Sequence, residues 1–359
     1  MIDRRSLLVS ASAGAAALAL PRLALAQSAS QGGTVPLTPL LDQFFQERLR
    51  LHPESATYLG LDKGPNADLK SKLSDQSEAG IAAAKAQTLN QMKRLEAVDR
   101  ARLSAPDQVS YDTVLYSLKS AAVVQAFPYG ANAFGPSPYA VSQLTGAYQQ
   151  VPDFLDTKHR IETAADAEAY VARLEAFATE IDNNTERMRH DAALGVSPPD
   201  FICDLTLDQL GKTRTAKASD NLVVTSIGRR AAAKGLPATY AAQAARIYDE
   251  RIGPALDRQI AQVRKARAGA RHDAGVWQFP EGAAFYQAAL HDTTTTSYTP
   301  EEVHKIGLEQ ARELSARVDG LLRQQGMTKG TIAERMTALY HDPSQLYPDT
   351  DAGKVEAIA

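Results

Sequence analysis

Residues 282–325 read GAAFYQAALHDTTTTSYTPEEVHKIGLEQARELSARVDGLLRQQ, and this stretch indicates the fold class. Thr299 and Glu302 have the spacing of a helix capping box, and Pro300 occupies the first helical position. Apolar or small residues then recur at helical spacing, at Val303, Ile306, Gly307, Ala311, Leu314, Val318 and Leu321. The pattern predicts a long amphipathic helix over 299–326.

The same signals extend outward over the rest of the chain. Further helices are predicted over 38–51, 53–59, 76–98, 104–123, 163–194, 204–217, 220–233, 239–266, 281–291, 331–341 and 352–359. The helix over 163–194 is expected to bury Tyr170, Leu174 and Phe177. The sequence contains no internal repeat and no convincing run of strands. We therefore expect an all-α protein, a multi-helix array rather than a simple bundle.

Two segments do not follow the helical pattern. Residues 127–153 combine proline and glycine with aromatic side chains, and they predict an irregular loop held against the core. The alternative is that this loop forms the wall of a cleft. Residues 275–280 predict a short extended piece.

Composition limits the classes of function. Of the 359 residues, 44% are hydrophobic and 23% are charged, which is typical of a globular chain. The formal net charge is -3. Removal of residues 1–26 would take away three arginines and one aspartate and bring it to -5. This balance gives no electrostatic reason to expect nucleic acid or an anionic membrane as a partner. The single Cys203 excludes an intrachain disulfide and a cysteine-based zinc cluster.

The N-terminus predicts an export signal. Residues 1–26 contain the paired Arg4 and Arg5, a weakly apolar core too short to span a bilayer, and a small-x-small cleavage site. They are typical of a twin-arginine signal peptide, and an ordinary secretory signal is the alternative. We expect a flexible linker over 27–38 and a helical domain over 39–359. The mature protein would be periplasmic or secreted, without a membrane anchor after signal cleavage.

The last residues predict a helix that has barely begun. Thr350 or Asp351 can cap it, but no glycine or basic last turn ends it before Ala359. We expect the helical domain to be truncated at its C-terminus. A short frayed tail is the alternative.

Several stretches resemble a family of exported bacterial proteins known as domain of unknown function 885. They are LHPESATYLG at 51–60, QLTGAYQQVPDFL at 143–155, DAEAY at 166–170, and residues 195–201 and 282–308. The resemblance is collinear over roughly 39–359.

The resemblance implies a relationship to helical zinc metallopeptidases. Longer members of the family carry a His-Glu-x-x-x-Gly-His-like helix that would bind zinc. Here the histidines are His52, His159, His190, His272, His291, His304 and His341, and none has the spacing or the following glutamate of such a helix. The resemblance therefore implies that this chain supplies the N-terminal half, with zinc expected only in the complete family form. Without the zinc-binding helix the chain would be inactive alone, and peptide would be the substrate of the complete form.

Three side chains in the opening stretch are candidates for substrate binding. Tyr286 and Tyr298 could donate hydrogen bonds to a substrate carbonyl, and His304 could contact substrate or donate a proton. The alternatives are ordinary packing for the two tyrosines and partial burial for the histidine. The four threonines at 293–296 could pair with an extended peptide or serve as a plain connector.

Three functional hypotheses remain open. The first is the scaffold and cleft wall of an exported metallopeptidase-like protein, which predicts an exposed apolar face where the missing half docks. The second is a non-catalytic exported helical module that binds a peptide or a protein partner. The third is a metal-free acid–base enzyme that uses Glu301, Glu302 and His304.

Overall fold

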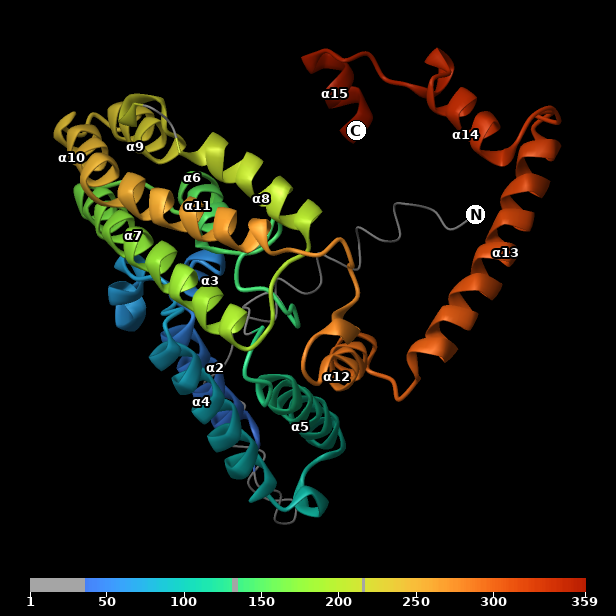
Figure 1. Cartoon of the computed structure of the whole chain (residues 1–359), viewed down its shortest axis with the longest axis horizontal. Coiled ribbons are helices and arrows are strands. Elements are labelled where there is room, and N and C mark those ends of the chain that lie inside the picture. The colour runs from blue at the N-terminus through green and yellow to red at the C-terminus, as the bar shows by residue number, and fades with distance from the viewer. Residues whose placement is uncertain (1–35, 131–134, 215–216) are drawn as a thin grey trace, which may run out of the picture. The chain divides into compact units, whose positions relative to one another are not determined.

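The computed structural model describes residues 36–130, 135–214 and 217–359 (Figure 1). Every regular element in these ranges is a helix, which confirms the all-α prediction. The chain divides into two compact units, one ending at Asp292 and one comprising Thr293–Ala359, and each is described by itself. The predicted signal peptide over 1–26 and all but the last residues of the linker over 27–38 lie outside the described residues.

The first unit contains most of the helices, and the last of them, α12, ends at Thr294, just past the boundary at Asp292. They are α2 (Thr38–Leu51), α3 (Pro53–Tyr58), η2 (Gly64–Ser71), α4 (Glu78–Glu96), η3 (Arg100–Arg102), α5 (Ala105–Gln125), α6 (Ala147–Thr157), α7 (Ala164–Ala193), α8 (Asp200–Thr213), η4 (Ala218–Asp220), α9 (Leu222–Ala233), α10 (Thr239–Ile247), η5 (Tyr248–Ile252), α11 (Gly253–Ala268), η6 (Val276–Gln278) and α12 (Gly282–Thr294).

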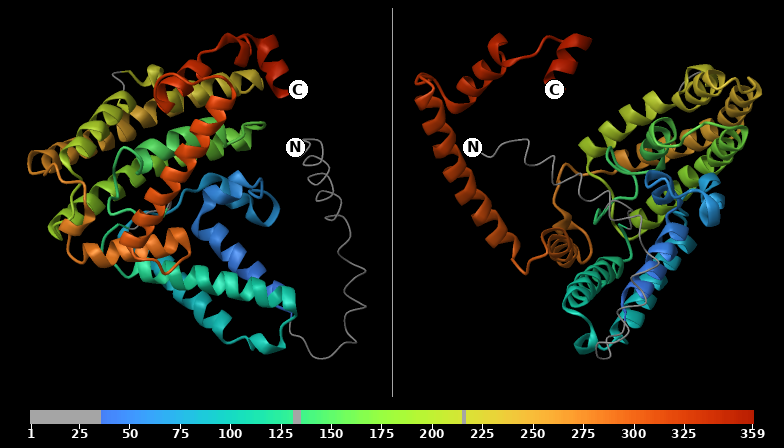
Figure 2. Two further views of the ribbon diagram at one scale, coloured as in Figure 1. Left: turned by 90° about the vertical axis from the view of Figure 1, so that its right-hand side faces the viewer. Right: turned by 180° about the vertical axis from the view of Figure 1, so that it is seen from behind.

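Helix α7 is the central element of the main core. It begins next to Thr163, where the sequence predicted a helix start, and Thr163 forms a capping box with Asp166. The helix packs against α6, α9, α10 and α11 (Figures 1 and 2). Tyr170, Leu174 and Phe177 are at most 1% exposed, which confirms the predicted inward face. Burial of each such side chain contributes roughly 1.5–3 kcal/mol. The segments before α7 are therefore positioned by contact with this helix.

Smaller clusters complete the described part of the first unit, and one of them joins Leu49, Ala56 and Leu69. Side chains of α2, α4 and α5 form another, and α4 and α5 lie side by side. A further cluster is aromatic and contains Tyr129, Tyr139, Phe279 and Phe285. The rings of Tyr139 and Phe279 meet edge to face at 5.9 Å. This cluster confirms that much of the irregular loop is held against the core.

The prediction of a loop throughout 127–153 is wrong at its C-terminal end. Helix α6 begins at Ala147 and continues through Pro152, although proline lacks the N–H that an interior position requires. Tyr148, Phe154 and Leu155 on the same helix are at most 3% exposed. Their burial offsets the cost of the proline, about 3 kcal/mol.

The prediction of one helix over 239–266 also needs correction. The backbone hydrogen bonds change to the π-helical pattern over Tyr248–Ile252, where the Gly253 amide donates to the Tyr248 carbonyl. Pro254 follows and has no N–H to continue the α-helical ladder, so the register shifts by one residue at this point. Residues 276–278, predicted as extended, form the 3₁₀ turn η6.

The second unit contains α13 (Pro300–Gln324), α14 (Ile332–Tyr340), η7 (Pro343–Gln345) and α15 (Asp351–Ile358). The predicted capping box of α13 is confirmed, since the Glu302 amide lies 3.2 Å from the Thr299 hydroxyl and the Thr299 amide lies 2.7 Å from the Glu302 carboxylate. Helices α13 and α14 are in contact. The buried Arg335 joins them by pairing with Asp319.

The long helix of this unit leaves its apolar side exposed. Leu308, Leu314 and Leu321 are 45%, 57% and 53% exposed, whereas Leu322 is the residue of α13 that is buried. Further apolar side chains of the unit are exposed at Met336, Tyr340, Leu346, Tyr347, Val355 and Ile358. Leu314 and Leu321 lie on one side of the helix, and we call them the α13 apolar face.

Candidate functional site

The three predicted substrate-binding residues fall in different units. Tyr286 lies on α12 in the first unit and is 48% exposed. Tyr298, 47% exposed, precedes α13, and the exposed His304 lies near the start of that helix; both belong to the second unit. All three side chains are accessible to a ligand, and their role stays a prediction.

Thr299 and Glu302, which lie near His304, cap the start of α13. The Thr299 amide and hydroxyl both donate to the Glu302 carboxylate and hold its pKa below the ordinary value. The loop predicted over 293–296 is shorter than expected, because α12 continues through Thr294 and ends where Thr295 adopts a φ of 54°.

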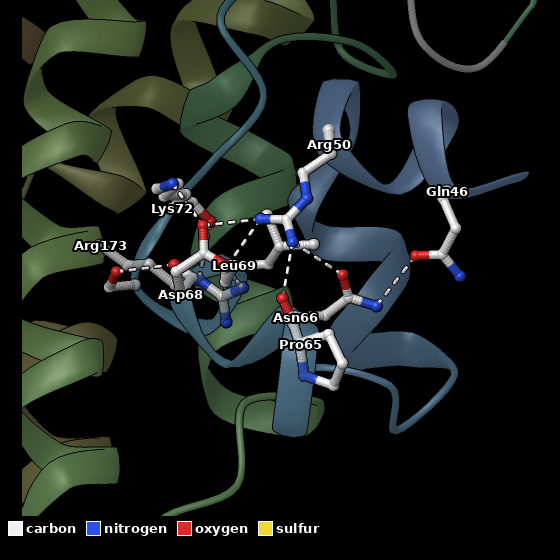
Figure 3. Close-up of polar contacts among 9 residues, drawn as sticks. Gln46, Arg50, Pro65, Asn66, Asp68, Leu69, Lys72 and Arg173 are labelled. Atoms are coloured by element: carbon white, nitrogen blue, oxygen red, sulfur yellow. Dashed lines mark hydrogen bonds and ion pairs between the residues drawn. The ribbon is translucent and has the colours of Figure 1, made fainter. Parts of the chain in front are cut away.

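A buried polar cluster on α7 was not predicted from the sequence. We call it the Arg173 cluster: Thr57, His159, Arg173 and the carbonyls of Leu69 and Lys72. Arg173 is 0% exposed and donates to the Thr57 hydroxyl at 2.8 Å. It also donates to the carbonyls of Lys72 and Leu69, at 2.9 and 3.1 Å (Figure 3). Burial lowers the pKa of Arg173 to about 10, so the guanidinium remains charged at neutral pH.

His159 is the fourth acceptor of this guanidinium. Its Nδ1 lies 2.8 Å from Nη1 of Arg173, and its Nε2 lies 2.9 Å from the Asp166 carbonyl. Since a guanidinium only donates, Nδ1 accepts and Nε2 carries the proton that is donated to Asp166. Burial, together with the Arg173 charge, lowers the pKa of His159 to about 4. The imidazole is therefore neutral at neutral pH.

A second arginine holds the outer side of the same η2 segment. Arg50 contacts the two carboxylate oxygens of Asp68 at 2.6 and 2.7 Å and donates to the Pro65 carbonyl at 2.7 Å (Figure 3). Lys72 also contacts Asp68, at 2.7 Å. Lys72 and Arg50 lower the pKa of Asp68 to about 2. The η2 segment is therefore held between a surface ion pair and the Arg173 cluster.

The extended segment that follows η2 is held by carboxylates. Glu54 accepts from the Ser74 amide at 2.9 Å and from the Ser74 hydroxyl at 2.6 Å. The Gln76 amide donates to Glu180 of α7 at 2.8 Å. Burial raises the pKa of Glu180. His52 lies 3.4 Å from the Ser74 hydroxyl, which donates to the closer carboxylate, so this serine does not have the arrangement of an activated nucleophile.

Asn184 of α7 links this segment to α6. Its side-chain oxygen accepts from the Ala147 amide at 2.7 Å, and its nitrogen donates to the Gln76 side chain at 2.8 Å. The stretches 51–60 and 143–155 noted in the sequence thus both bond to α7, and the stretch 166–170 lies within it. Their geometry indicates a scaffold, because the polar groups named in these contacts bond to one another within the chain.

Neither a zinc site nor a membrane span is found in the described part of the chain. No group of three or more histidine, cysteine, aspartate or glutamate side chains between residues 36 and 359, outside the two gaps, is arranged to hold a metal ion. The residues present therefore do not fit the zinc that the resemblance implies. In the same ranges no helix combines the length and apolar character needed to cross a bilayer.

Comparison with known proteins gives a family and a fold. No curated protein matches the chain. A crystal structure of "the putative lipoprotein from Colwellia psychrerythraea" matches with a TM-score of 0.76 and 24% identity, over 90% of this chain and 56% of that one. The chain thus spans little more than half the length of this solved protein, and the likeness establishes the shared helical fold.

The family model of bacterial proteins of unknown function DUF885 matches residues 53–359. This match covers most of the chain and includes both units. The chain belongs to the DUF885 family of bacterial proteins.

Proposed function

We propose that this chain forms the scaffold and one wall of the substrate cleft in an exported metallopeptidase-like protein. The observation that carries the proposal is the exposed α13 apolar face in a unit with little core of its own. Exposed apolar surface of this kind marks a site of contact with another polypeptide. The solved relative is nearly twice as long as the part of it that this chain matches, and it supplies a candidate for that polypeptide.

In this proposal the chain contributes substrate contacts, and the zinc ligands come from the docked part. Tyr286, Tyr298 and His304 are accessible side chains with hydrogen-bonding groups suited to a peptide backbone. The predicted signal peptide and the description of the solved relative as a lipoprotein both support export to the periplasm or beyond.

The test compares three purified proteins: this chain, a longer family member, and that member cut at the position aligned with Ala359. Zinc content and hydrolysis of a mixed peptide library are measured for each. We expect stoichiometric zinc and hydrolysis only for the long protein. Stoichiometric zinc or peptide hydrolysis by the 359-residue chain would overturn the division of roles.

The alternative is a non-catalytic exported module that binds a peptide or a protein partner through the α13 apolar face. It predicts that the longer family member also lacks hydrolytic activity. A longer family member that has tyrosines at the positions aligned with Tyr286 and Tyr298 separates the two proposals further, when both are replaced by phenylalanine. A loss of peptide hydrolysis without a loss of partner binding supports the cleft-wall role.

A further inference from the structure

Helix α12 is bounded at both ends by residues with a left-handed backbone. Apart from glycines, Glu281 and Thr295 are the residues of the described ranges with a positive φ, at 55° and 54°. They directly precede and follow α12, which comprises Gly282–Thr294. This conformation is unfavourable for a residue with a side chain, and it is most unusual for a β-branched residue such as threonine. Such residues persist where surrounding contacts hold the backbone, and they are concentrated at functional and switching elements.

Buried packing holds the N-terminal end of α12. The Phe285 ring is 3% exposed and lies 5.4 Å from the Tyr129 ring of the aromatic cluster. The Tyr129 hydroxyl donates to the Pro280 carbonyl at 2.7 Å. Glu281 lies between Pro280 and the helix, so its backbone is held from both sides.

Hydrogen bonds from α5 hold the C-terminal end of α12. The Ser120 hydroxyl donates to Oδ1 of Asp292 at 2.7 Å. One turn away on α5, the Tyr116 hydroxyl donates to the His291 carbonyl at 3.3 Å and lies 3.2 Å from Nε2 of the same histidine. These contacts place α5 beside the C-terminal half of α12 (Figure 1). His291 and Asp292 are partly exposed to solvent, in contrast to Phe285.

The two ends therefore differ in the kind of contact that holds them. Opening at the N-terminal end would expose the Phe285 ring to water, which is unfavourable in proportion to its apolar area. The hydroxyl and carboxylate groups at the other end can bond to water instead, with a small net change in free energy. Movement of this end also allows Thr295 to return to an ordinary backbone conformation, which offsets part of the lost contacts.

We propose that α12 is a strained, movable helix whose C-terminal half leaves α5 and returns, with the aromatic cluster as the pivot. Tyr286 lies on this helix and is 48% exposed, so the movement changes where its hydroxyl is presented. The inference concerns α12 alone and does not depend on the proposed peptidase-like function.

Hydrogen–deuterium exchange of the complete chain, measured by mass spectrometry, tests the movement. In the wild type the amides of 287–294 should exchange faster than those in the buried middle of α7. Thr295→Gly should slow exchange in 287–294 by about fivefold or more, because glycine adopts the left-handed backbone freely and stabilises the closed position. The Thr295 side chain is exposed, so this substitution changes the backbone preference rather than the packing of the core.

Two further variants complete the experiment. Thr294→Gly is the matched control, since Thr294 is the preceding residue and has helical backbone, and glycine there should speed exchange rather than slow it. Ser120→Ala removes one hydrogen bond from the C-terminal end and should speed exchange in 287–294 by about threefold, without a change in α7.

Three results would overturn the proposal. The first is unchanged or faster exchange of 287–294 in Thr295→Gly, since no strain would then oppose the closed position. The second is a wild-type chain in which 287–294 are protected as well as the middle of α7, which would mean that α12 is fixed. The third is slower exchange in both glycine variants or no effect of Ser120→Ala, because the strain at Thr295 or the contact with α5 would then not control the movement.

Discussion

Arg173 and His159 form a buried pair in which a charged guanidinium donates to a neutral imidazole at 2.8 Å. The pair lies where α7 meets the end of α6, and it bonds onward to α3, η2 and the Asp166 carbonyl. One imidazole tautomer satisfies both ring nitrogens, so the pair resists protonation. This relationship determines how the first unit responds to acid and to substitution.

The first prediction concerns acid stability. The pKa of His159 falls from 6.5 to about 4 on folding, so the unfolded chain binds more protons between these values. The stability that His159 contributes is complete above pH 6.5 and is lost as the pH falls toward 4. The largest loss is about 3 kcal/mol, and urea unfolding between pH 4 and pH 7 measures it.

Two histidine variants separate this effect from general acid sensitivity. His159→Gln should flatten the pH dependence in this window, because the amide oxygen still accepts from Arg173 but does not titrate. His304→Gln, at an exposed position on α13, should leave the dependence as in the wild type. If His159→Gln keeps the full pH dependence of the free energy of unfolding, a group other than His159 causes that dependence, and the prediction is wrong.

The second prediction concerns the loss of the guanidinium. Arg173→Met leaves two backbone carbonyls, the Thr57 hydroxyl and His159 without their donor. We expect a loss of about 3 kcal/mol or more in the free energy of unfolding. Arg189→Met is the control, since Arg189 forms a surface pair with Glu186 worth at most about 1 kcal/mol. Equal effects in urea unfolding would contradict a structural role for the Arg173 cluster.

The sequence predicts helix starts well because the signals are local. Helix starts were predicted near 104, at 163 and at 299, and the structure has Ser104, Thr163 and Thr299 as the N-caps there. Of these, Thr299 was predicted as a cap and is confirmed. The signals fail where a distant contact decides the structure. Helix α6 forms despite Pro152 because its apolar face packs against α7. The residues next to Pro152 in the sequence do not indicate that contact.

The Arg173 cluster was missed for the same reason. Arg173 lies between Tyr170 and Leu174 on the inward face, and a sequence cannot show that four acceptors from three other segments surround it. A charged residue at an inward position was the available signal. Tyr286, Tyr298 and His304 carry side chains that can hydrogen-bond to a substrate, and all three are exposed.

The third prediction compares two glycines, Gly146, whose backbone conformation disfavours a side chain, and Gly211, whose helical position accepts one. Gly146 precedes α6 at a φ of 117°, and a Cβ there would approach the Tyr148 ring to 3.2 Å. Gly146→Ala should therefore destabilise the first unit by about 1–3 kcal/mol. Gly211 lies inside α8, where an added Cβ would meet nothing within 4 Å, so Gly211→Ala should stabilise by about 0.4–1 kcal/mol. Thermal unfolding measures whether each substitution raises or lowers the stability. Two changes in the same direction would contradict the predicted difference between Gly146 and Gly211.

The last prediction concerns the α13 apolar face. Leu314 and Leu321 lie seven residues apart, on one side of the helix, and more than half of each side chain is exposed. If this face binds another polypeptide, the chain alone should bind a hydrophobic dye or self-associate. Leu314→Glu combined with Leu321→Glu should reduce dye fluorescence and sedimentation-detected association several-fold. Ala316→Glu, two residues from Leu314 and on a different side of α13, is the matched control and should change neither.

A wild-type chain that is monomeric and binds no dye would mean that its own residues cover the face in solution, and the docking proposal would then fail. A wild-type chain that associates equally with and without the glutamates would place the contact elsewhere on the second unit.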